Sequence, residues 1–522
     1  MPDKNLPALP VGLFNFQAIR EAEMLYVDKT ALLQEMACKP GRYFLSRPRR
    51  FGKSLTLSTL DAMFSGKADL FKGLAAENWV REQSAHPNPV LRIDMSRLNT
   101  ENVETFRMSL EDMLNREARR KNVSLRSRTA EGMFEDLITA LHDTLGPVVV
   151  LVDEYDKPVL DSLGTLEKAE AMRQKLRSFY TVVKSCEDCL RFVMLTGISK
   201  FTKMGAFSAI NNLSDISMAP KYGALCGYTQ AELEQYFSGW IAHLAAREQT
   251  TQAALLAKIR EYYDGFCFDG ETKVYNPFST LQLFDQGSFR NYWYESASPW
   301  FIARYMKDHG ALSTEEFRHT RIGILQIGAQ EIERAEPASF LLQSGYLTIE
   351  KIDGDMLTLD YPNKEVRTAM SAMFLYHSCG LKTYAALGND LWKALATGDL
   401  DEAKRLFNAA LAGIPYDVWN KLPGLNEALF QSYFIMLLEG AGLQVAGEVE
   451  AARGRSDVEV RTSARVWIIE FKTAENAQTV DAKSAEAQLQ IASRGYADKY
   501  AADARQVTSA AFIVDLEKRQ VV

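Results

Sequence analysis

The feature that most constrains this chain is a short apolar run, Tyr43–Ser46, that leads through a basic loop into Gly52-Lys53-Ser54 and a helical stretch. The order of strand, loop, Gly-Lys-Ser and helix is typical of phosphate-binding loops. In such loops backbone N–H groups and a helix N-terminus point at an anion, the lysine reaches the β- and γ-phosphates, and the serine hydroxyl ligates Mg²⁺. We therefore expect a nucleotide site that contains Arg50, Gly52, Lys53 and Ser54.

The loop departs from the usual pattern at its first position, where Arg47 stands instead of glycine. A residue with a Cβ must then make the tight turn. Within 12 residues the segment carries five cations, Arg42, Arg47, Arg49, Arg50 and Lys53. They would serve either ATP or a contact between subunits of a homo-oligomer, and we expect most of the arginines to be solvated or paired with acids. Taken alone, the segment fits a solvated basic loop equally well.

A second segment supplies the other half of a nucleotide site. The apolar run Val148–Val152 ends in Asp153 and Glu154, as expected of a buried parallel strand. Ligands of open α/β sheets bind at the carboxyl ends of strands, so Asp153 is placed to hold Mg²⁺ and Glu154 to polarise a water. A strand-ending cap is the plain alternative, but the two segments support each other. Another apolar strand, Phe192–Thr196, ends in polar residues up to Lys200 that would sense a γ-phosphate.

The 522 residues are enough for three to four domains at about 150 residues each. The first half alternates short apolar runs with helix-like stretches, which predicts an α/β fold with a parallel sheet. Residues 346–350 and 356–359 flank an Asp-Gly-Asp turn and predict a β-hairpin. We expect five parts: a P-loop domain over 1–226, a helical lid over 227–304, a winged-helix-like module over 305–375, a helical linker over 376–418, and a separate α/β domain over 419–522.

The C-terminal part contains a second predicted hairpin, in which Ser456–Val460 and Val466–Lys472 flank a polar turn. The register that fits best pairs Val460 with Trp467, Val458 with Ile469, and Asp457 with Glu470. Side chains alternate between the faces of a strand, so the apolar members share one face. The other face receives Asp457, Glu470 and Lys472, with the two carboxylates about 5 Å apart at Cβ.

Two like carboxylates this close repel each other unless a cation lies between them, and hard oxygen ligands suit Mg²⁺ or Mn²⁺. Lys472 is then placed to orient a water or to stabilise charge on a phosphodiester. This is the Asp…Glu-x-Lys pattern of metal-dependent nucleases, and Glu427 and Gln488 on the flanking helices would complete the site. A cross-strand salt bridge on an exposed face is the alternative. The near-continuous apolar run that contains Glu470 argues against exposure.

Composition excludes several classes of protein. The formal net charge is −7, so the chain is no polycationic nucleic-acid binder. The six cysteines are scattered, residues 1–20 have no apolar leader core, and no run of about 18 apolar residues occurs, so we expect a cytoplasmic protein without a membrane partner. Cys186 and Cys189 have CxxC spacing but no second pair, and the six histidines show no metal-ligand spacing, so we assign them no chemistry.

Together these segments resemble a bacterial and archaeal family, the AAA-ATPase-like proteins with a C-terminal PD-(D/E)XK nuclease superfamily domain. The resemblance covers nearly the whole chain and rests on Leu25–Thr30, Arg47–Ser54, Val152–Pro158, Leu195–Lys200, Tyr275–Ser279, Gly454–Asp457, Glu470–Lys472 and Gly495–Tyr500. It implies an AAA-like P-loop domain and a restriction-endonuclease-like α/β domain. The loop that begins Arg47-Pro48 is similar to the family's own form of the Walker A element.

The resemblance also implies roles for single residues. Lys53 and Ser54 would contact phosphate and Mg²⁺, and Asp153 and Glu154 would form the Walker B pair. The nuclease-type residues would be Asp457, Glu470, Lys472 and the auxiliary Gln488. The family more often has an aliphatic residue where Ser456 stands, so the packing behind Asp457 would differ here.

Our leading hypothesis is an ATP-binding and ATP-hydrolysing protein whose nucleotide state governs a Mg²⁺-dependent nuclease domain that acts on nucleic-acid phosphodiesters. The alternative is a regulatory nucleotide switch whose C-terminal domain only binds nucleic acid or protein. A third reading makes the C-terminal acids purely structural. The sequence leaves open whether the nucleic acid is DNA or RNA.

Overall fold

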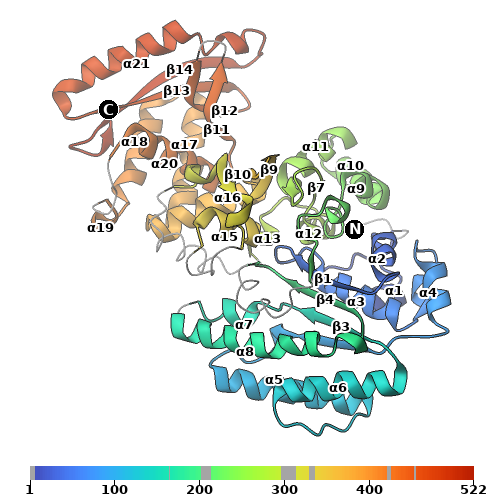
Figure 1. Ribbon diagram of the computed structural model, residues 1–522. Coiled ribbons are helices and arrows are strands. Elements are labelled where there is room, and N and C mark those ends of the chain that lie inside the picture. Colours follow the sequence, from blue (N-terminus) through green and yellow to red (C-terminus); the bar gives the residue numbers. More distant parts are fainter. Residues whose placement is uncertain are drawn as a thin grey trace. The chain divides into compact units, whose positions relative to one another are not determined.

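The computed structural model describes residues 6–163, 165–200, 213–295, 313–328, 335–419, 425–451 and 454–522 (Figure 1). The chain divides into two compact units. The first contains Met1–Trp293 and His319–Asn363, and the second contains Tyr294–Arg318 and Lys364–Val522. The chain therefore passes between the units three times. Within the described residues, no helix combines the length and the apolar character needed to cross a membrane.

The first unit is built on a five-stranded sheet in the order β2-β3-β4-β1-β5, and every neighbouring pair is parallel. Its strands are β1 (Gly41–Ser46), β2 (Val90–Asp94), β3 (Val148–Asp153), β4 (Leu190–Gly197) and β5 (Ser214–Asp215). Every residue of β3 is buried, as the continuous apolar run predicts. The predicted parallel α/β fold is confirmed.

Helices cover both faces of this sheet. The helices α5 (Val103–Lys121), α6 (Ala130–Leu145) and α8 (Leu166–Ser185) pack together (Figure 1). They share one core with every second residue of β3, because side chains alternate along a strand. On the other face lies α3 (Lys53–Phe64), whose Phe64 ring lies 5.0 Å from that of Phe192 in β4. Shorter helices flank this core: α1 (Phe16–Glu21), α2 (Thr30–Ala37), α4 (Glu77–Gln83) and α7 (Lys157–Leu160).

A helical region with its own core follows the sheet in sequence. It comprises α9 (Gln230–Tyr236), α10 (Ser238–Arg247), α11 (Gln252–Tyr263), α12 (Pro277–Gln286), α13 (Tyr292–Glu295) and the short hairpin of β6 (Phe266–Cys267) and β7 (Lys273–Val274). Lys29, before α2, ties this region to the N-terminal segment through an ion pair of 2.6 Å with Glu232 of α9.

A three-stranded antiparallel sheet in the order β8-β10-β9 completes the first unit. It consists of β8 (Thr320–Gly323), β9 (Thr348–Asp353) and β10 (Met356–Asp360), and α15 (Pro337–Ser344) precedes β9. The predicted hairpin over 346–359 is confirmed. The boundaries of the two units cut across the 305–375 segment, and both its winged-helix-like character and the five-part division stay predictions.

The second unit has a five-stranded mixed sheet, β11-β12-β13-β14-β15, in which only β13 and β14 are parallel. Its strands are β11 (Val445–Ala451), β12 (Gly454–Arg461), β13 (Arg465–Ala474), β14 (Gln506–Asp515) and β15 (Gln520–Val521). Its helices are α16 (Lys364–Met373), α17 (Tyr384–Thr397), α18 (Leu400–Ala412), α19 (Tyr416–Trp419), α20 (Glu427–Gly440) and α21 (Val480–Arg494). The crossover between the parallel strands β13 and β14 contains α21, because parallel neighbours cannot be joined by a tight turn.

The two faces of this second sheet are covered differently. Phe407 of α18 and Phe434 of α20 pack against Phe471 of β13 and Phe512 of β14. On the opposite face, Ala487 of α21 lies in a small apolar cluster with two strand residues. The face covered by α21 is the one that carries the alternate, charged residues of β13.

Candidate functional site

The loop between β1 and α3 forms the first site. Its left-handed residues are Arg50, with a φ of 65°, and Gly52, with a φ of 92°. A residue with a Cβ does adopt the left-handed conformation, as the sequence predicts, but this residue is Arg50 and not Arg47, which has no positive φ. Arg50 carries that conformation three residues later. Its exposed guanidinium lies 5.0 Å from the centre of the Phe278 ring.

Arg47 is buried, with 1% of its surface exposed. Its guanidinium donates hydrogen bonds to the carbonyls of Ser46 (2.9 Å), Ser217 (2.7 Å) and Tyr222 (3.1 Å). It also lies 4.2 Å from the centre of the Phe268 ring. The expectation of solvated or acid-paired arginines therefore fails for Arg47, which fastens the loop to neighbouring backbone.

Lys53 begins α3 and is also buried. Its ammonium donates hydrogen bonds to the carbonyls of Arg47 (2.8 Å) and Pro48 (2.9 Å). Burial lowers the pKa of Lys53, and the charge of Asp153 partly offsets this effect. The amine is thus held inside the loop that it closes, where a bound anion would favour its charged form. Ser54 is half-buried in the first turn of α3.

The Walker B candidates lie at the carboxyl end of β3. Asp153 is buried and accepts a hydrogen bond of 2.9 Å from the hydroxyl of Thr196 in β4, the strand between β3 and β1. Glu154 has a φ of 49° and is half-buried. Burial raises the pKa of Glu154, whereas the charge of Lys53 lowers it. The structure thus gathers Lys53, Asp153 and Glu154 at one edge of the sheet.

Asp156 is a site residue that the sequence does not predict. Its buried carboxylate accepts hydrogen bonds from the backbone N–H groups of Ile198 (3.0 Å) and Ser199 (2.7 Å) and from the Ser199 hydroxyl (2.8 Å). Burial raises the pKa of Asp156, and the hydrogen bonds from Ser199 oppose that shift. Asp156 therefore fixes the segment after β4 that was predicted to sense a γ-phosphate. The sequence feature that points to this role is the position of Asp156, three residues after Asp153.

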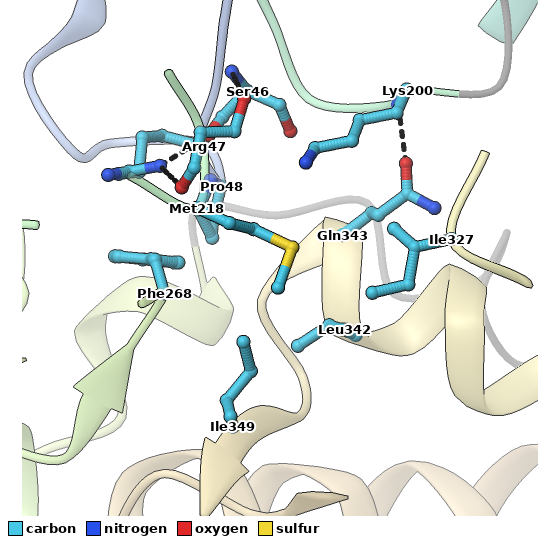
Figure 2. A pocket seen from close by; sticks show the side chains of 11 residues that line it. Ser46, Arg47, Pro48, Lys200, Met218, Phe268, Ile327, Leu342, Gln343 and Ile349 are labelled. Atoms are coloured by element: carbon cyan, nitrogen blue, oxygen red, sulfur yellow. Dashed lines mark hydrogen bonds between the residues drawn. The ribbon is translucent and has the colours of Figure 1, made fainter. Parts of the chain in front are cut away.

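A small cavity lies beside the base of the loop (Figure 2). Its volume of about 40 Å³ is enough for a few waters and far too small for a nucleotide. Neither Lys53 nor Asp153 lines it. Within this group of residues the backbone N–H of Lys200 donates a hydrogen bond to the Gln343 side chain. The cavity thus marks where α15 packs against the base of the loop.

The second site lies on the sheet of the C-terminal domain. The register of β12 and β13 pairs Val458 with Ile469 and Val460 with Trp467, so the predicted hairpin is confirmed. Asp457 and Glu470 occupy the next positions along the two strands. The Asp457 carboxylate accepts a hydrogen bond of 2.7 Å from the backbone N–H of Phe471, the neighbour of Glu470.

Lys472 joins the acids of this site. Its ammonium lies 3.2 Å from Oε1 of Glu470 and 3.5 Å from Oε2 of Glu427, at the start of α20. The other Glu427 oxygen accepts a hydrogen bond of 3.3 Å from the backbone N–H of Thr473. Burial lowers the pKa of Lys472, but the charges of Glu470 and Glu427 prevail and raise it. The structure thus brings Asp457, Glu470, Lys472 and Glu427 together.

Glu470 has the most unusual surroundings. Its side chain has no exposed surface, and Oε2 is buried without a hydrogen bond from any residue that the structure describes. Burial and the nearby Asp457 carboxylate raise the pKa of Glu470 to about 7, although Lys472 opposes this shift. A buried carboxylate oxygen without a donor is costly unless a cation or proton satisfies it. The residues present therefore fit a hard divalent ion at this point.

Among the described residues, no hydrogen bond joins Gln488 to the acids. Gln488 is exposed on α21, whose inward residue is Ala487. Gln490 lies three residues after Ala487 and so shares the inward stripe of the helix, where its amide donates a hydrogen bond of 3.3 Å to the Tyr496 hydroxyl. Both glutamines are visible in the sequence. Their positions around the helix relative to Ala487 distinguish the inward Gln490 from the exposed Gln488.

The structure also shows why Ser456 suits its place. It is fully buried, and its hydroxyl lies within hydrogen-bonding distance of two acceptors, the carbonyl of Val449 (3.3 Å) and the carboxylate of Glu459 (3.1 Å), to either of which it can donate. Glu459, a buried acid that the sequence analysis did not single out, pairs at 2.6 Å with Lys499 and accepts a hydrogen bond from the Tyr500 hydroxyl. This network fastens the segment after α21 to β12. In the sequence, Glu459 lies between Val458 and Val460, and this alternation of an acid with two valines is the pattern that points to it.

Two domain models match this chain. Residues 10–207 match the family of predicted AAA-ATPases, and residues 425–522 match the PD-(D/E)XK nuclease superfamily. An uncharacterized protein in the vnfD 5′ region of Azotobacter chroococcum mcd 1 is 34% identical over 506 residues, which are 95% of this chain and 94% of that protein. The chain therefore belongs to the family of AAA-ATPase-like proteins with a C-terminal PD-(D/E)XK nuclease superfamily domain.

Solved structures give only a distant likeness. The Aeropyrum pernix ORC2 protein in its ADPNP-ADP complexes is 12% identical with a TM-score of 0.28, over 71% of this chain and 97% of that chain. The Aeropyrum pernix ORC1 protein in complex with DNA is 12% identical with a TM-score of 0.27, over 82% and 88% of the two chains. Scores this low carry no argument about the site.

Proposed function

We propose that this protein binds and hydrolyses ATP at the loop between β1 and α3, and that its C-terminal domain is a metal-dependent nuclease governed by the nucleotide state. Lys53 and the backbone around Gly52 would hold the phosphates, with Arg50 beside them. Ser54 and Asp153 would hold Mg²⁺, and Glu154 would polarise a water. The ion neutralises charge on the phosphates when bound. The gathering of Lys53, Asp153 and Glu154 at one sheet edge supports this assignment.

The nuclease part of the proposal depends chiefly on Glu470. A buried carboxylate oxygen without a donor, beside Asp457 and Lys472, suits Mg²⁺ or Mn²⁺ better than it suits a structural salt bridge. Asp457 and Glu470 would hold the ion, which would polarise a phosphodiester. Lys472 would orient a water, and Glu427 would hold the Lys472 ammonium in place. Gln490 replaces Gln488 as our choice for the auxiliary residue on α21, because only Gln490 lies on the inward stripe.

A cleavage screen tests this proposal directly. We would incubate the full chain with labelled DNA and RNA, with Mg²⁺ or Mn²⁺, and with or without ATP. Lys472→Ala should abolish cleavage and leave ATP binding intact, whereas Lys53→Ala should weaken ATP binding at least tenfold and remove the effect of ATP on cleavage at ATP levels that saturate only the wild type. Lys393→Ala, at an exposed lysine of α17, is the matched control and should behave as wild type.

The alternative, a nucleotide switch with a non-catalytic nuclease fold, predicts a different result. No preparation would then cleave DNA or RNA at any ATP level, although nucleic acid or protein could still bind to the C-terminal domain. If Asp457→Asn left metal binding by calorimetry unchanged, the C-terminal acids would be structural, an outcome that the nuclease proposal forbids.

A further inference from the structure

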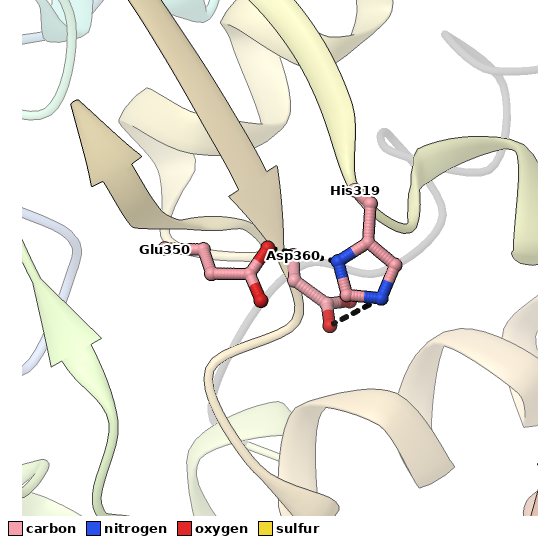
Figure 3. A group of neighbouring side chains, drawn as sticks. All are labelled: His319, Glu350 and Asp360. Carbon is pink, nitrogen blue, oxygen red and sulfur yellow. Dashed lines mark hydrogen bonds and ion pairs between the residues drawn. The ribbon is translucent and has the colours of Figure 1, made fainter. Parts of the chain in front are cut away.

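A histidine and two acids that belong to neither site described above meet on the small sheet of the first unit. His319 directly precedes β8, Glu350 lies in β9, and Asp360 ends β10 (Figure 3). None of the six histidines has a metal-ligating residue at close sequence spacing, so the sequence predicts no chemistry for them. The ligands that meet His319 come from two other strands, at 31 and 41 residues' separation, so spacing could not show them.

Backbone irregularities bring these side chains together. The pairing of β10 with β9 shifts between Thr358, which faces Lys351, and Leu359, which faces Ile349. Glu350 is therefore the extra residue of a β-bulge, a feature that re-aims a side chain. His319 has a φ of 51°, in the left-handed region that residues other than glycine rarely adopt. Neither conformation is needed to continue a regular sheet.

The geometry of the cluster suits several ligands to one ion. Nδ1 of His319 lies 2.8 Å from Oε2 of Glu350, and its Nε2 lies 3.9 Å from Oδ2 of Asp360. One ligand atom from each residue lies within 4.8 Å of the others. His319 and Glu350 are exposed and Asp360 is half-buried, so the ring and the Glu350 carboxylate have room to turn toward a common point.

We propose that His319, Glu350 and Asp360 form a Zn²⁺-type site, independent of the nucleotide and nuclease sites. One imidazole nitrogen and two carboxylates are ligands that Zn²⁺ accepts, with water in the remaining position. An imidazole also disfavours Mg²⁺, which prefers an all-oxygen shell. With the imidazole neutral, two carboxylate charges face each other across the ring, and a divalent ion would compensate both. In the structure each ring nitrogen of His319 faces a different carboxylate. For all three residues to bind one ion, one carboxylate must therefore rotate toward the nitrogen that faces the other carboxylate.

Zinc titration tests the proposal. The full chain carrying Asp457→Asn and Glu470→Gln, to silence the C-terminal acids, would be stripped with EDTA and titrated with ZnCl₂ by calorimetry, with stoichiometry checked by native mass spectrometry. One Zn²⁺ per chain should bind. His319→Ala should remove that ion or weaken its binding at least tenfold, and Glu350→Gln should do the same. His86→Ala, at an exposed histidine elsewhere in the unit, is the control and should bind as before.

Two results would overturn the proposal. One is that His319→Ala and its parent bind the same number of Zn²⁺ ions with the same affinity. The other is that neither binds Zn²⁺, which would leave the cluster as an ion pair only. Circular dichroism of each variant shows whether it is folded. If His319→Ala does not fold, Glu350→Gln, which keeps the shape of the side chain, serves as the test variant. Because the parent lacks the nuclease acids, the result does not depend on the proposed function.

Discussion

Glu470 is a carboxylate whose folded environment favours its protonated form. Its pKa is raised to about 7 from an ordinary 4.5, because the side chain is buried and Asp457 lies close by. Because the pKa of Glu470 is higher in the folded protein than in the unfolded chain, the side chain ionises more readily when the chain is unfolded, and ionisation therefore favours unfolding. The metal-free protein therefore loses stability as the pH rises from about 4.5 to about 7. A divalent ion at the acids would reverse that loss, because the ion needs the ionised carboxylate.

Glu470→Gln should remove this pH dependence. Relative to the variant, the wild-type protein in EDTA should lose on the order of 2 kcal/mol of unfolding free energy between pH 5 and pH 8. Urea unfolding at the two pH values measures the difference. Glu486→Gln, at a surface position of α21, is the control and should follow the wild type. A pH profile that is identical in wild type and Glu470→Gln would contradict the raised pKa.

Lys53 is a buried amine that holds two loop carbonyls. Replacing it by alanine should weaken ATP binding at least tenfold, about 1.4 kcal/mol or more, because the phosphates lose their principal cation. Calorimetric titration with a non-hydrolysable ATP analogue and Mg²⁺ measures the affinity. Lys184→Ala, at an exposed lysine of α8, should bind as wild type. Equal affinities for wild type and Lys53→Ala would place the nucleotide site elsewhere.

At the scale of elements, the phosphate loop is held by an arginine rather than shaped by a first glycine. Arg47→Gly would restore the usual sequence pattern but leave the carbonyls of Ser46, Ser217 and Tyr222 without their donor. Since a buried unsatisfied group costs about 1–3 kcal/mol, we expect a loss of roughly 3 kcal/mol or more. Chemical denaturation measures it, and Arg47→Lys should recover part. An Arg47→Gly protein as stable as wild type would show that the buried arginine is dispensable.

The elements themselves were largely predictable from the sequence. The P-loop strand, the apolar strand ending in Asp153, and the β12–β13 register follow from apolar periodicity, because burial selects one face of each strand. The burial of Arg47 was not predictable, since two of its three carbonyl partners, those of Ser217 and Tyr222, are remote in sequence. The sequence points to Gln488 on this helix but does not show which glutamine faces the sheet, because the phase of a helix against a sheet depends on tertiary packing.

At the scale of the whole molecule, the two units have separate cores and separate candidate ligands. We expect calorimetry to resolve two unfolding transitions, one for each unit. ATP with Mg²⁺ should stabilise only the first unit and should therefore shift only one of them. At one hundred times Kd, that ligand should add about 2.7 kcal/mol to one transition. Mn²⁺ without nucleotide should shift the other transition, and Glu470→Gln should abolish that shift. A single transition that moves with either ligand would contradict the independence of the cores.

The three passages of the chain between the units have a consequence for limited proteolysis. A cut between Trp293 and His319 yields an N-terminal fragment and a C-terminal fragment that still carries residues 319–363. Those residues stay packed in the first unit, for instance through the hydrogen bonds between Thr348 and Cys267. The two polypeptides would then separate on a denaturing gel but would elute together as one complex under native conditions.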